Sequence, residues 1–351
     1  MSAPGKRRHG LRAFFVLTAL LAGAFAYWAW DRYTGFVDTP VSGLEAGETL
    51  VVERGDSFAR VLQRLRDSGV REGHDLEWQL LARQLEAAGR IQVGEYPLEP
   101  GTTPRELLER MRDGKVLSYR FTIVEGWNIR QLRAALAEAE PLLQETADLD
   151  DAALMEALGH PGQHPEGRFL PETYAYTRGD SDLDLLGRAH DALDKALDAA
   201  WQSRDADLPL ETREEALVLA SIVEKETGIA DERPQIAGVF MRRLELGMRL
   251  QTDPTVIYGM GSAYAGNLRK TDLLTDTPYN TYTRDGLPPT PIAMVGAQAL
   301  QAVTHPAEGD ALYFVAIGDG SGRHVFSKTL SEHQAAVREY VRRYRAQHGP
   351  Q

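Results

Sequence analysis

The pattern of apolar residues first separates an N-terminal segment from the rest of the chain. Residues 13–30, AFFVLTALLAGAFAYWAW, contain no charged side chain, and four basic residues precede them: Lys6, Arg7, Arg8 and Arg12. A helix of about 20 apolar residues crosses a bilayer, and basic residues mark its cytoplasmic end. We therefore predict a cytoplasmic tip and a single-pass transmembrane anchor over residues 1–30, with the bulk of the chain on the other side of the membrane.

The alternative for this segment is a cleaved signal peptide. Ala24-Phe25-Ala26 resembles the small-residue site at which signal peptides are cut. An uncleaved helix, however, explains Tyr27, Trp28 and Trp30 as an aromatic belt at the far membrane interface. For this reason we favour the anchor.

Amphipathic periodicity begins after residues 31–47, which show no sustained period and are interpreted as a linker. Residues 49–70, TLVVERGDSFARVLQRLRDSGV, predict a short strand, a turn and a helix. The apolar face of this helix comprises Phe58, Val61, Leu62 and Leu65. The first copy of this pattern resembles a LysM module, a small sugar-binding fold, and we assign residues 48–118 to a LysM-like small α/β module.

The order strand, turn and helix occurs three times, at residues 49–70, 96–114 and 121–139. A glutamate precedes the turn glycine in each copy, in the pairs Glu53 and Gly55, Glu99 and Gly101, and Glu125 and Gly126. Glycine permits the unusual backbone angle of such a turn, and a nearby Ser, Thr or Asn can cap the helix. Turn chemistry alone can therefore produce the repeat, and it does not by itself indicate sugar binding.

The remaining chain is interpreted as a middle region, residues 119–205, and a C-terminal region, residues 206–351. From 140 to about 210 the pattern is mainly helical, interrupted by an ordered loop at residues 164–176, HPEGRFLPETYAY. Helices follow, then a β-hairpin formed by residues 311–317 and 323–327, and a charged helix closes the chain. The fold class expected is therefore α+β: an N-terminal transmembrane helix, the small module and a mixed α+β domain.

Composition narrows the functional classes. The chain has 351 residues, a net charge of −12 and no cysteine. An acidic chain lacks the basic stripe that neutralises phosphates, so we exclude nucleic acid as a partner. The absence of cysteine excludes disulfides, thiolate nucleophiles and Cys-ligated zinc. GxxxxGK[ST], HExxH and GxSxG motifs are also absent.

One helix end carries candidate chemistry, in the octapeptide SIVEKETG at residues 221–228. Leu219, Ile222, Val223 and Glu226 follow i, i+3, i+4, i+7 and share one helix face. If Gly228 ends the helix, Glu226 lies in the last turn, where the helix dipole is negative. Burial and this dipole both raise the pKa of a carboxyl group, as a general acid near neutral pH requires.

Glu224 is the alternative acid in this octapeptide. It is rotated by about 200° from Glu226 around the helix, and Leu217 and Ala220 lie on its own face. An isolated Glu-Lys-Glu is most often solvated, with Lys225 in a local ion pair. The following loops, at residues 249–261, 277–292 and 303–308, supply the aromatic, amide and hydroxyl groups that are typical of a carbohydrate cleft.

At these residues the chain resembles the MltG-type (YceG-like) endolytic murein transglycosylases. The resemblance rests on ASIVEKET, GMRLQTDPTVIYGMG, YNTYTRDGLPPTPI and ALYFVAIGDGSGRHVFSKTLSEH, in the family's order and spacing over residues 120–345. It implies a bacterial inner-membrane enzyme that cleaves the bond from N-acetylmuramic acid (MurNAc) to N-acetylglucosamine (GlcNAc) within peptidoglycan strands. Residues 206–351 would then be its catalytic region.

The resemblance places the catalytic glutamate on Glu226, in agreement with the helix-face argument. Such an enzyme forms 1,6-anhydroMurNAc ends, consumes no water, and needs neither a metal nor a cofactor. The residues that we expect to orient the sugar are Gln251, Asp253, Tyr258, Asn280 and Tyr282. The implied setting also suggests glycan synthases or penicillin-binding proteins as partners.

Two alternative functions remain at this point. A hydrolytic muramidase needs a second carboxylate beside the acid, and Glu166, Glu172 or Asp253 could supply it. A non-catalytic tether would bind peptidoglycan and cell-wall synthesis proteins, and Glu226 would then be replaceable.

Overall fold

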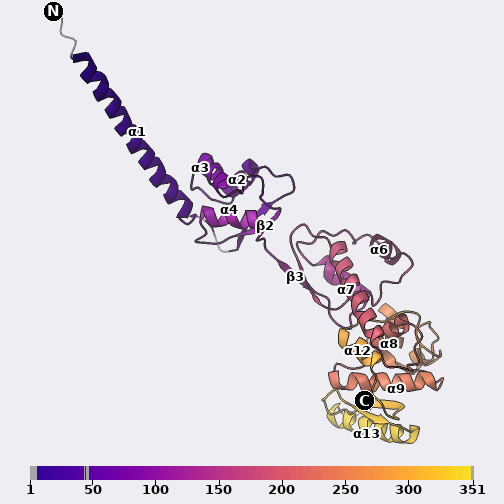
Figure 1. The fold of residues 1–351 in the computed structure, drawn as a ribbon. Coiled ribbons are helices and arrows are strands. Elements are labelled where there is room, and N and C mark those ends of the chain that lie inside the picture. The colour runs from indigo at the N-terminus through magenta and orange to yellow at the C-terminus, as the bar shows by residue number, and fades with distance from the viewer. Residues whose placement is uncertain (1–5, 43, 45–46, 349–351) are drawn as a thin grey trace, which may run out of the picture. The chain divides into compact units, whose positions relative to one another are not determined.

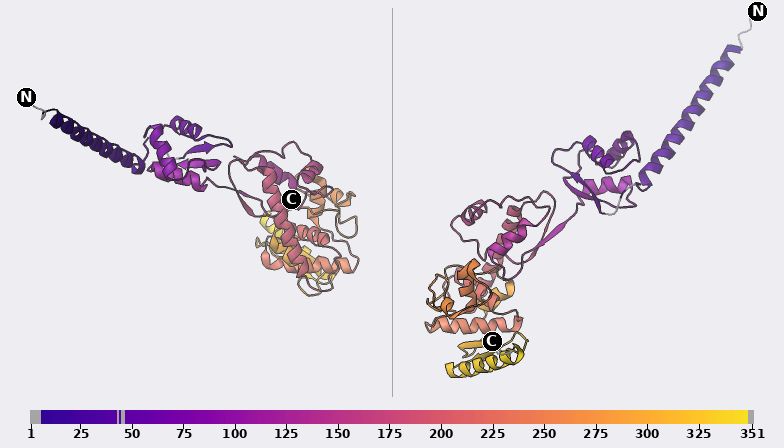
Figure 2. Two further views of the ribbon diagram at one scale, coloured as in Figure 1. Left: turned by 45° about the horizontal axis from the view of Figure 1, so that its top comes forward. Right: turned by 180° about the vertical axis from the view of Figure 1, so that it is seen from behind.

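The computed structural model describes residues 6–42, 44 and 47–348. Helices and short two-stranded sheets alternate along the chain, which confirms the mixed α+β class. The chain packs as two compact units: the first reaches Tyr119 and includes Thr177–Gly179, and the second comprises Arg120–Tyr176 and the chain from Asp180 onward. Figures 1 and 2 show the course of the chain through both.

The first helix, α1 (Lys6–Asp38), contains the predicted apolar segment and continues beyond it. By length and composition its stretch Leu11–Asp38 could cross a membrane. The most apolar part of this stretch is not buried within the protein. The linker prediction is wrong for residues 31–38, which are helical, because this end of α1 has packing partners. Val37 is buried, and the ring of Phe36 lies 5.3 Å from that of Trp78. Residues 43, 45 and 46 of the predicted linker lie outside the described residues.

The first unit is built on one antiparallel strand pair. Its elements are β1 (Glu48–Val52), α2 (Phe58–Asp67), α3 (Asp75–Gln84), β2 (Gly94–Leu98) and α4 (Pro104–Asp113). Leu50 pairs with Tyr96 across the two strands, and both side chains are buried with Trp78 and Leu107. The helices therefore bury their apolar faces against the inner face of a two-stranded sheet, which could not be stable alone.

The three sequence repeats share one turn geometry. Gly55, Gly101 and Gly126 have φ angles of 90°, 92° and 76°. The helix that follows each turn is capped by a side-chain oxygen, from Ser57 in α2, Thr103 in α4 and Asn128 in α5 (Ile129–Ala137). The third copy belongs to the second unit, so the same local turn geometry occurs in both units.

The middle region is less helical than the sequence pattern predicted. Its elements are β3 (Tyr119–Thr122), α6 (Asp151–Ala157), β4 (Thr173–Tyr176) and α7 (Asp182–Gln202). The end of the expected loop at 164–176 forms β4, which pairs with β3. Alternating exposure explains this strand, since Tyr176 is buried while Thr173 and Ala175 are exposed.

The second unit is organised around α8 (Arg213–Glu226). The helices α7, α9 (Arg233–Glu245), α10 (Asp253–Met260) and α12 (Ala297–Thr304) all pack against α8 or against each other. Every residue from Ala216 to Val223 is buried, so α8 is enclosed on all sides and not on one face alone. Short elements fill the connections: η1 (Ala230–Glu232), η2 (Gly261–Ala263) and α11 (Lys270–Leu274).

The chain ends in a hairpin and a long helix, both as predicted. Strands β5 (Tyr313–Ala316) and β6 (His324–Ser327) are antiparallel, and α13 (Leu330–His348) packs against both. The turn between the strands contains Gly318, Gly320 and Gly322, all with positive φ. Glycine tolerates this conformation without the strain that a side chain would add.

Candidate active site

Glu226 is the last residue of the enclosed helix α8. The prediction that it occupies the last turn is confirmed, but Gly228 does not end the helix in a left-handed conformation. Thr227 is the C-cap, with an extended backbone at φ −147°. This extended cap turns the chain away directly after Glu226, and the half-buried carboxyl group faces a pocket instead of the core.

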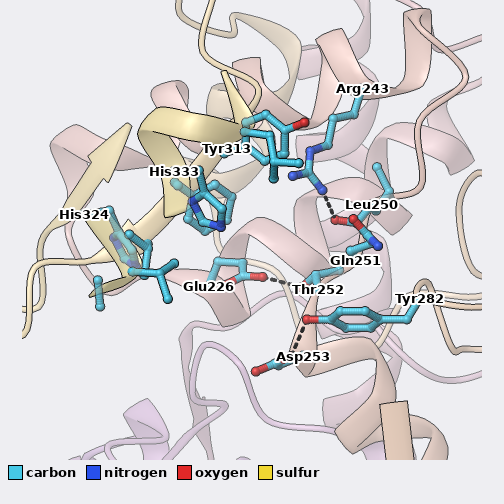
Figure 3. Close-up of a pocket in the computed structure, with 15 residues that line it drawn as sticks. Glu226, Arg243, Leu250, Gln251, Thr252, Asp253, Tyr282, Tyr313, His324 and His333 are labelled. Carbon is cyan, nitrogen blue, oxygen red and sulfur yellow. Dashed lines mark hydrogen bonds between the residues drawn. The ribbon is translucent and has the colours of Figure 1, made fainter. Parts of the chain in front are cut away.

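The pocket has a volume of about 440 Å³ and gathers residues from α8, α9, α10, the hairpin and α13 (Figure 3). Its lining residues are Glu226, Arg243, Leu250, Gln251, Thr252, Asp253, Tyr282, Tyr313, Phe314, Val315, Ala316, His324, Leu330, His333 and Val337. Segments more than 100 residues apart in the sequence thus meet around one carboxyl group.

The surroundings of Glu226 favour its protonated form. Burial raises its pKa to about 7, and the charge of Asp253 acts in the same direction. The hydrogen bond from the Thr252 hydroxyl and the charge of Arg243 oppose this rise. A carboxyl group with a pKa near the working pH can both donate and accept a proton during a reaction.

Asp253 and Tyr282 form a pair on one wall of the pocket. The phenol oxygen of Tyr282 donates a hydrogen bond of 2.6 Å to Oδ1 of Asp253 (Figure 3). Burial, and then this carboxylate, raise the pKa of Tyr282, so the phenol stays protonated and acts as a donor. Asp253 also begins α10, where the helix dipole favours a negative charge.

Gln251 reaches the pocket from a strained backbone. Its φ is 48°, which is uncommon for a residue with a side chain. The main-chain N–H of Gln251 donates to the carbonyl of Thr281 at 3.2 Å, and the adjacent N–H of Thr252 donates to the hydroxyl of Thr281. These bonds hold the turn in its unusual conformation, and strain of this kind is often found at functional sites.

The opposite wall is a stack of three side chains that the sequence reasoning missed. The guanidinium of Arg243 lies 5.1 Å from the centre of the Tyr313 ring, and His333 stacks on the same ring at 5.2 Å. Figure 3 shows these residues facing the wall formed by Asp253 and Tyr282. One available signal was the position of Arg243 at i+7 from Ile236 and i+3 from Phe240, on the buried face of α9.

Arg243 is a buried cation whose hydrogen bonds go to carbonyl groups. Its Nε donates to Leu312 at 2.6 Å, and its Nη1 donates to Arg249 and Leu250 at 3.2 and 2.8 Å. Within the described residues it makes no ion pair with a carboxylate. The positive charge is therefore available to groups in the pocket, Glu226 among them.

Glu224, the alternative acid, does not line this pocket. Its Oε1 accepts a hydrogen bond from Arg233 at 3.2 Å, and its Oε2 accepts one from the N–H of Gly296 at 3.0 Å. Burial is the largest influence on Glu224 and raises its pKa. These contacts join the end of α8 to α9 and to the start of α12, which is a structural role.

Two further candidates, Tyr258 and Asn280, also lie outside this pocket. The amide nitrogen of the fully buried Asn280 donates to the carbonyls of Leu273 and Thr275 at 3.2 and 2.7 Å. The ring of Tyr258 lies 4.7 Å from that of Tyr279, and its hydroxyl is hydrogen-bonded to Glu166. Both residues fix the loop that carries Tyr282.

Of the three carboxylates considered as partners in a muramidase, Asp253 lines the pocket with Glu226, and Glu166 and Glu172 do not. Glu166 is fully buried and accepts a hydrogen bond from the N–H of Ile129 at 3.1 Å, and burial raises its pKa to about 7. Among the described residues, no cluster of three or more His, Asp or Glu side chains could hold a metal ion.

Comparison with known proteins places this chain in a family. The model of the YceG-like family matches residues 50–339. The chain is similar to the endolytic murein transglycosylase of Bacillus subtilis, with 32% identity over 72% of this chain and 74% of that protein. It also matches the endolytic murein transglycosylase of Streptococcus pneumoniae serotype 2, with 26% identity over 72% of this chain and 51% of that protein.

A solved structure supports the same relationship. The crystal structure of a YceG-like protein from Listeria monocytogenes aligns with a TM-score of 0.54 and 27% identity, covering 82% of this chain and 98% of that one. The family match includes α8, the loops and the hairpin that together form the pocket. The chain therefore belongs to the YceG-like family.

Proposed function

We propose that the protein is a membrane-anchored endolytic lytic transglycosylase, with Glu226 as its general acid and base. Its substrate would be the MurNAc–GlcNAc bond within peptidoglycan strands, and its product a 1,6-anhydroMurNAc end. The observation that carries the proposal is Glu226 itself: a carboxyl group at the end of a buried helix, with a pKa raised to about 7, in a polar and aromatic pocket. The names of the relatives in Bacillus and Streptococcus support the substrate.

The proposed reaction needs one proton and returns it. The carboxyl group of Glu226 gives its proton to the glycosidic oxygen, the bond from that oxygen to C1 of MurNAc breaks, and positive charge develops at C1. The 6-hydroxyl of the same sugar then attacks C1 and passes its proton to the Glu226 carboxylate. Atoms balance without water, and one residue serves first as acid and then as base.

The other pocket residues would position the sugar and balance charge. Asp253 stabilises the positive charge that develops at C1, and the bond from Tyr282 fixes the orientation of its carboxylate. Gln251 offers an amide to the sugar hydroxyls from its strained turn. We assign Tyr258 and Asn280 to shaping the Tyr282 loop, because their polar groups are bonded within the protein.

Two parts of the chain would place the enzyme on its substrate. The apolar helix α1 would anchor it in the bacterial inner membrane, with the two units on the periplasmic side. The LysM-like first unit would bind glycan strands. Nascent strands are made at this membrane surface, so glycan synthases or penicillin-binding proteins are the expected neighbours.

Product mass tests the reaction. Full-length protein in a neutral detergent would be incubated with purified peptidoglycan, and the fragments analysed by mass spectrometry. We expect anhydro ends, one water lighter than hydrolysed ends, from the wild type and from a control, Glu245→Gln, at an exposed glutamate outside the pocket. We expect none from Glu226→Gln. Reducing ends would instead identify a muramidase, and no product from any sample would favour the tether.

A further inference from the structure

The catalytic pocket continues onto the surface of α13. Leu330, His333 and Val337 of this helix line the pocket, at positions i, i+3 and i+7 of one face. Val337 also lines a second, shallow groove of about 390 Å³, together with Arg338, Val341, Arg342 and Arg345. The two hollows therefore share a wall residue, and a ligand that leaves the pocket past Val337 meets α13 (yellow in Figure 1).

This groove is strongly basic in an acidic chain. Residues 338–345, REYVRRYR, contain four arginines and one glutamate, whereas the whole chain has a net charge of −12. Arg338 and Arg345 are exposed and make no hydrogen bond or ion pair with the described residues. Among the residues that the structure describes, Arg342 pairs with Glu339 alone, at 2.7 Å, and its side chain is 76% exposed. Such an exposed pair holds its arginine weakly.

The charge pattern extends inward from this surface. Arg243, in the pocket, is a buried guanidinium without a carboxylate partner among the described residues. A buried cation is costly unless an anion or polar groups compensate it. An anionic substituent next to the reacting sugar would therefore meet one cation inside the pocket and others along α13.

We propose that the groove along α13 is a subsite for the stem peptide of peptidoglycan, in which the arginines bind the carboxylates of that peptide. This inference rests on the proposed function. The peptide is attached to the lactyl group of muramic acid, the sugar that reacts in the pocket, and its free carboxylates complement guanidinium groups. The eight steps from Val337 to Arg345 rise by about 12 Å along the helix, a distance that about four extended peptide residues span.

The test compares strands with and without stem peptides, the latter prepared with an amidase that removes the peptide. Full-length wild type is compared with the double variant Arg338→Glu/Arg345→Glu. The matched control is Lys195→Glu, which reverses an exposed charge on α7 outside the grooves described here. Anhydro ends are counted over time, and thermal unfolding verifies that each variant is folded.

We expect the wild type and the control to cleave peptide-bearing strands faster than peptide-free strands. In the double variant the ratio of the two cleavage rates should be about three- to tenfold smaller than in the wild type, as expected for two surface charge contacts. High salt should reduce this ratio in the wild type as well. Free stem peptide should inhibit the wild type more strongly than the double variant. Together these results would establish the subsite.

Three results would overturn the subsite while leaving the transglycosylase intact. The first is that the wild type cleaves strands with and without stem peptides equally fast. The second is that the double variant prefers peptide-bearing strands as strongly as the wild type does. The third is inhibition by glycerol phosphate, an anionic lipid headgroup, and not by stem peptide, which would assign the groove to a membrane surface. If no sample produces anhydro ends, the proposed function fails, and the subsite fails with it.

Discussion

The hydroxyl of Thr252 donates a hydrogen bond to Oε1 of Glu226. Thr252 is buried and precedes α10, whereas Glu226 ends α8, so this bond joins two segments that line the pocket. It stabilises the carboxylate more than the neutral acid, and it therefore sets how far burial can raise the pKa of Glu226.

Thr252→Val should raise the pKa of Glu226 further. A hydrogen bond to a charged group contributes about 1.5–3 kcal/mol, and about 1.4 kcal/mol corresponds to one pKa unit, so a shift of about one to two units is expected. The general acid works when protonated, and activity is lost as pH rises through its pKa. The alkaline limb of the kcat profile should therefore move to higher pH.

The control for this change is Thr304→Val in α12, a buried threonine outside the pocket whose hydroxyl donates to the carbonyl of Leu300 at 3.0 Å. It should change stability without moving the alkaline limb. An unchanged limb in Thr252→Val would show that the bond seen in the structure does not act on the titrating group.

Asp253→Asn should move the same limb in the opposite direction. The negative charge of Asp253 raises the pKa of Glu226, so its removal lowers that pKa and activity should be lost at lower pH. If Asp253 also stabilises the positive charge at C1, kcat at the optimum should fall by about 100-fold. Pre-steady-state cleavage of a defined strand across pH measures both effects, and a limb that moves upward would contradict the electrostatic assignment.

Tyr282→Phe isolates the orientation of Asp253 from its charge. The variant keeps the ring but removes the hydroxyl that donates to Oδ1 of Asp253. We expect kcat to fall by about tenfold, or about 1.4 kcal/mol, near the lower limit for a hydrogen bond to a charged group, with KM nearly unchanged. A large rise in KM with unchanged kcat would instead show that the hydroxyl binds the sugar directly.

Local sequence patterns predicted the helices and turns that local chemistry determines. The turn glycines were visible in the sequence, with a Ser, Thr or Asn expected nearby as a cap, and so was the place of Glu226 in a last helical turn. The extension of α1 was not, because its last turns are stabilised by contact with Trp78, more than 40 residues away. A contact between residues so far apart produces no periodic pattern in the sequence near the helix end.

In the candidate site, too, some residues could be predicted from the local sequence and others only from the packing of distant elements. Gln251, Asp253 and Tyr282 were among the five residues expected to orient the sugar, and they line the pocket with Glu226. Arg243 and His333 escaped notice because their functional neighbours are brought together only by the packing of α9 and α13 against the hairpin. Asn280 has the polar character of a sugar ligand, yet the loop closes on its side chain and uses its amide internally.

Glu226→Gln should stabilise the folded protein at alkaline pH. The pKa of Glu226 is raised from 4.5 to about 7 in the folded state, so the folded protein binds the proton more tightly than the unfolded chain does. Stability from this group is full below about pH 4.5 and is lost as pH rises towards 7. A shift of this size corresponds to about 3 kcal/mol.

The amide variant cannot ionise, so its free energy of unfolding should exceed that of the wild type by about 2–3 kcal/mol at pH 8. The difference should vanish near pH 4. Chemical denaturation at the two pH values measures it, with Glu245→Gln as the exposed control. Equal stability of Glu226→Gln and wild type at pH 8 would show that Glu226 titrates normally.

Glu224→Ala tests the structural role assigned to the alternative acid. The change leaves the buried Arg233 without its 3.2 Å partner, although Gln298 still accepts a bond from it and Glu125 lies 3.7 Å away. Removing one partner of a buried pair typically costs 3–5 kcal/mol, and with these remaining contacts we expect a loss of about 2–3 kcal/mol in the free energy of unfolding. Activity per folded molecule should remain, because the pocket around Glu226 is not touched.

A double-mutant cycle separates this ion pair from general damage to α8. In Glu224→Ala/Arg233→Met no buried charge is left unpaired at this position, because Glu125, the other carboxylate near Arg233, is 48% exposed. The double variant should therefore be more stable than the sum of the two single changes predicts. Additive losses would mean that the two side chains do not interact in solution. A Glu224→Ala protein that is folded but inactive would instead show that Glu224 takes part in catalysis. A carboxylate with a purely structural role can lower the fraction of folded protein, but not the rate at which each folded molecule reacts.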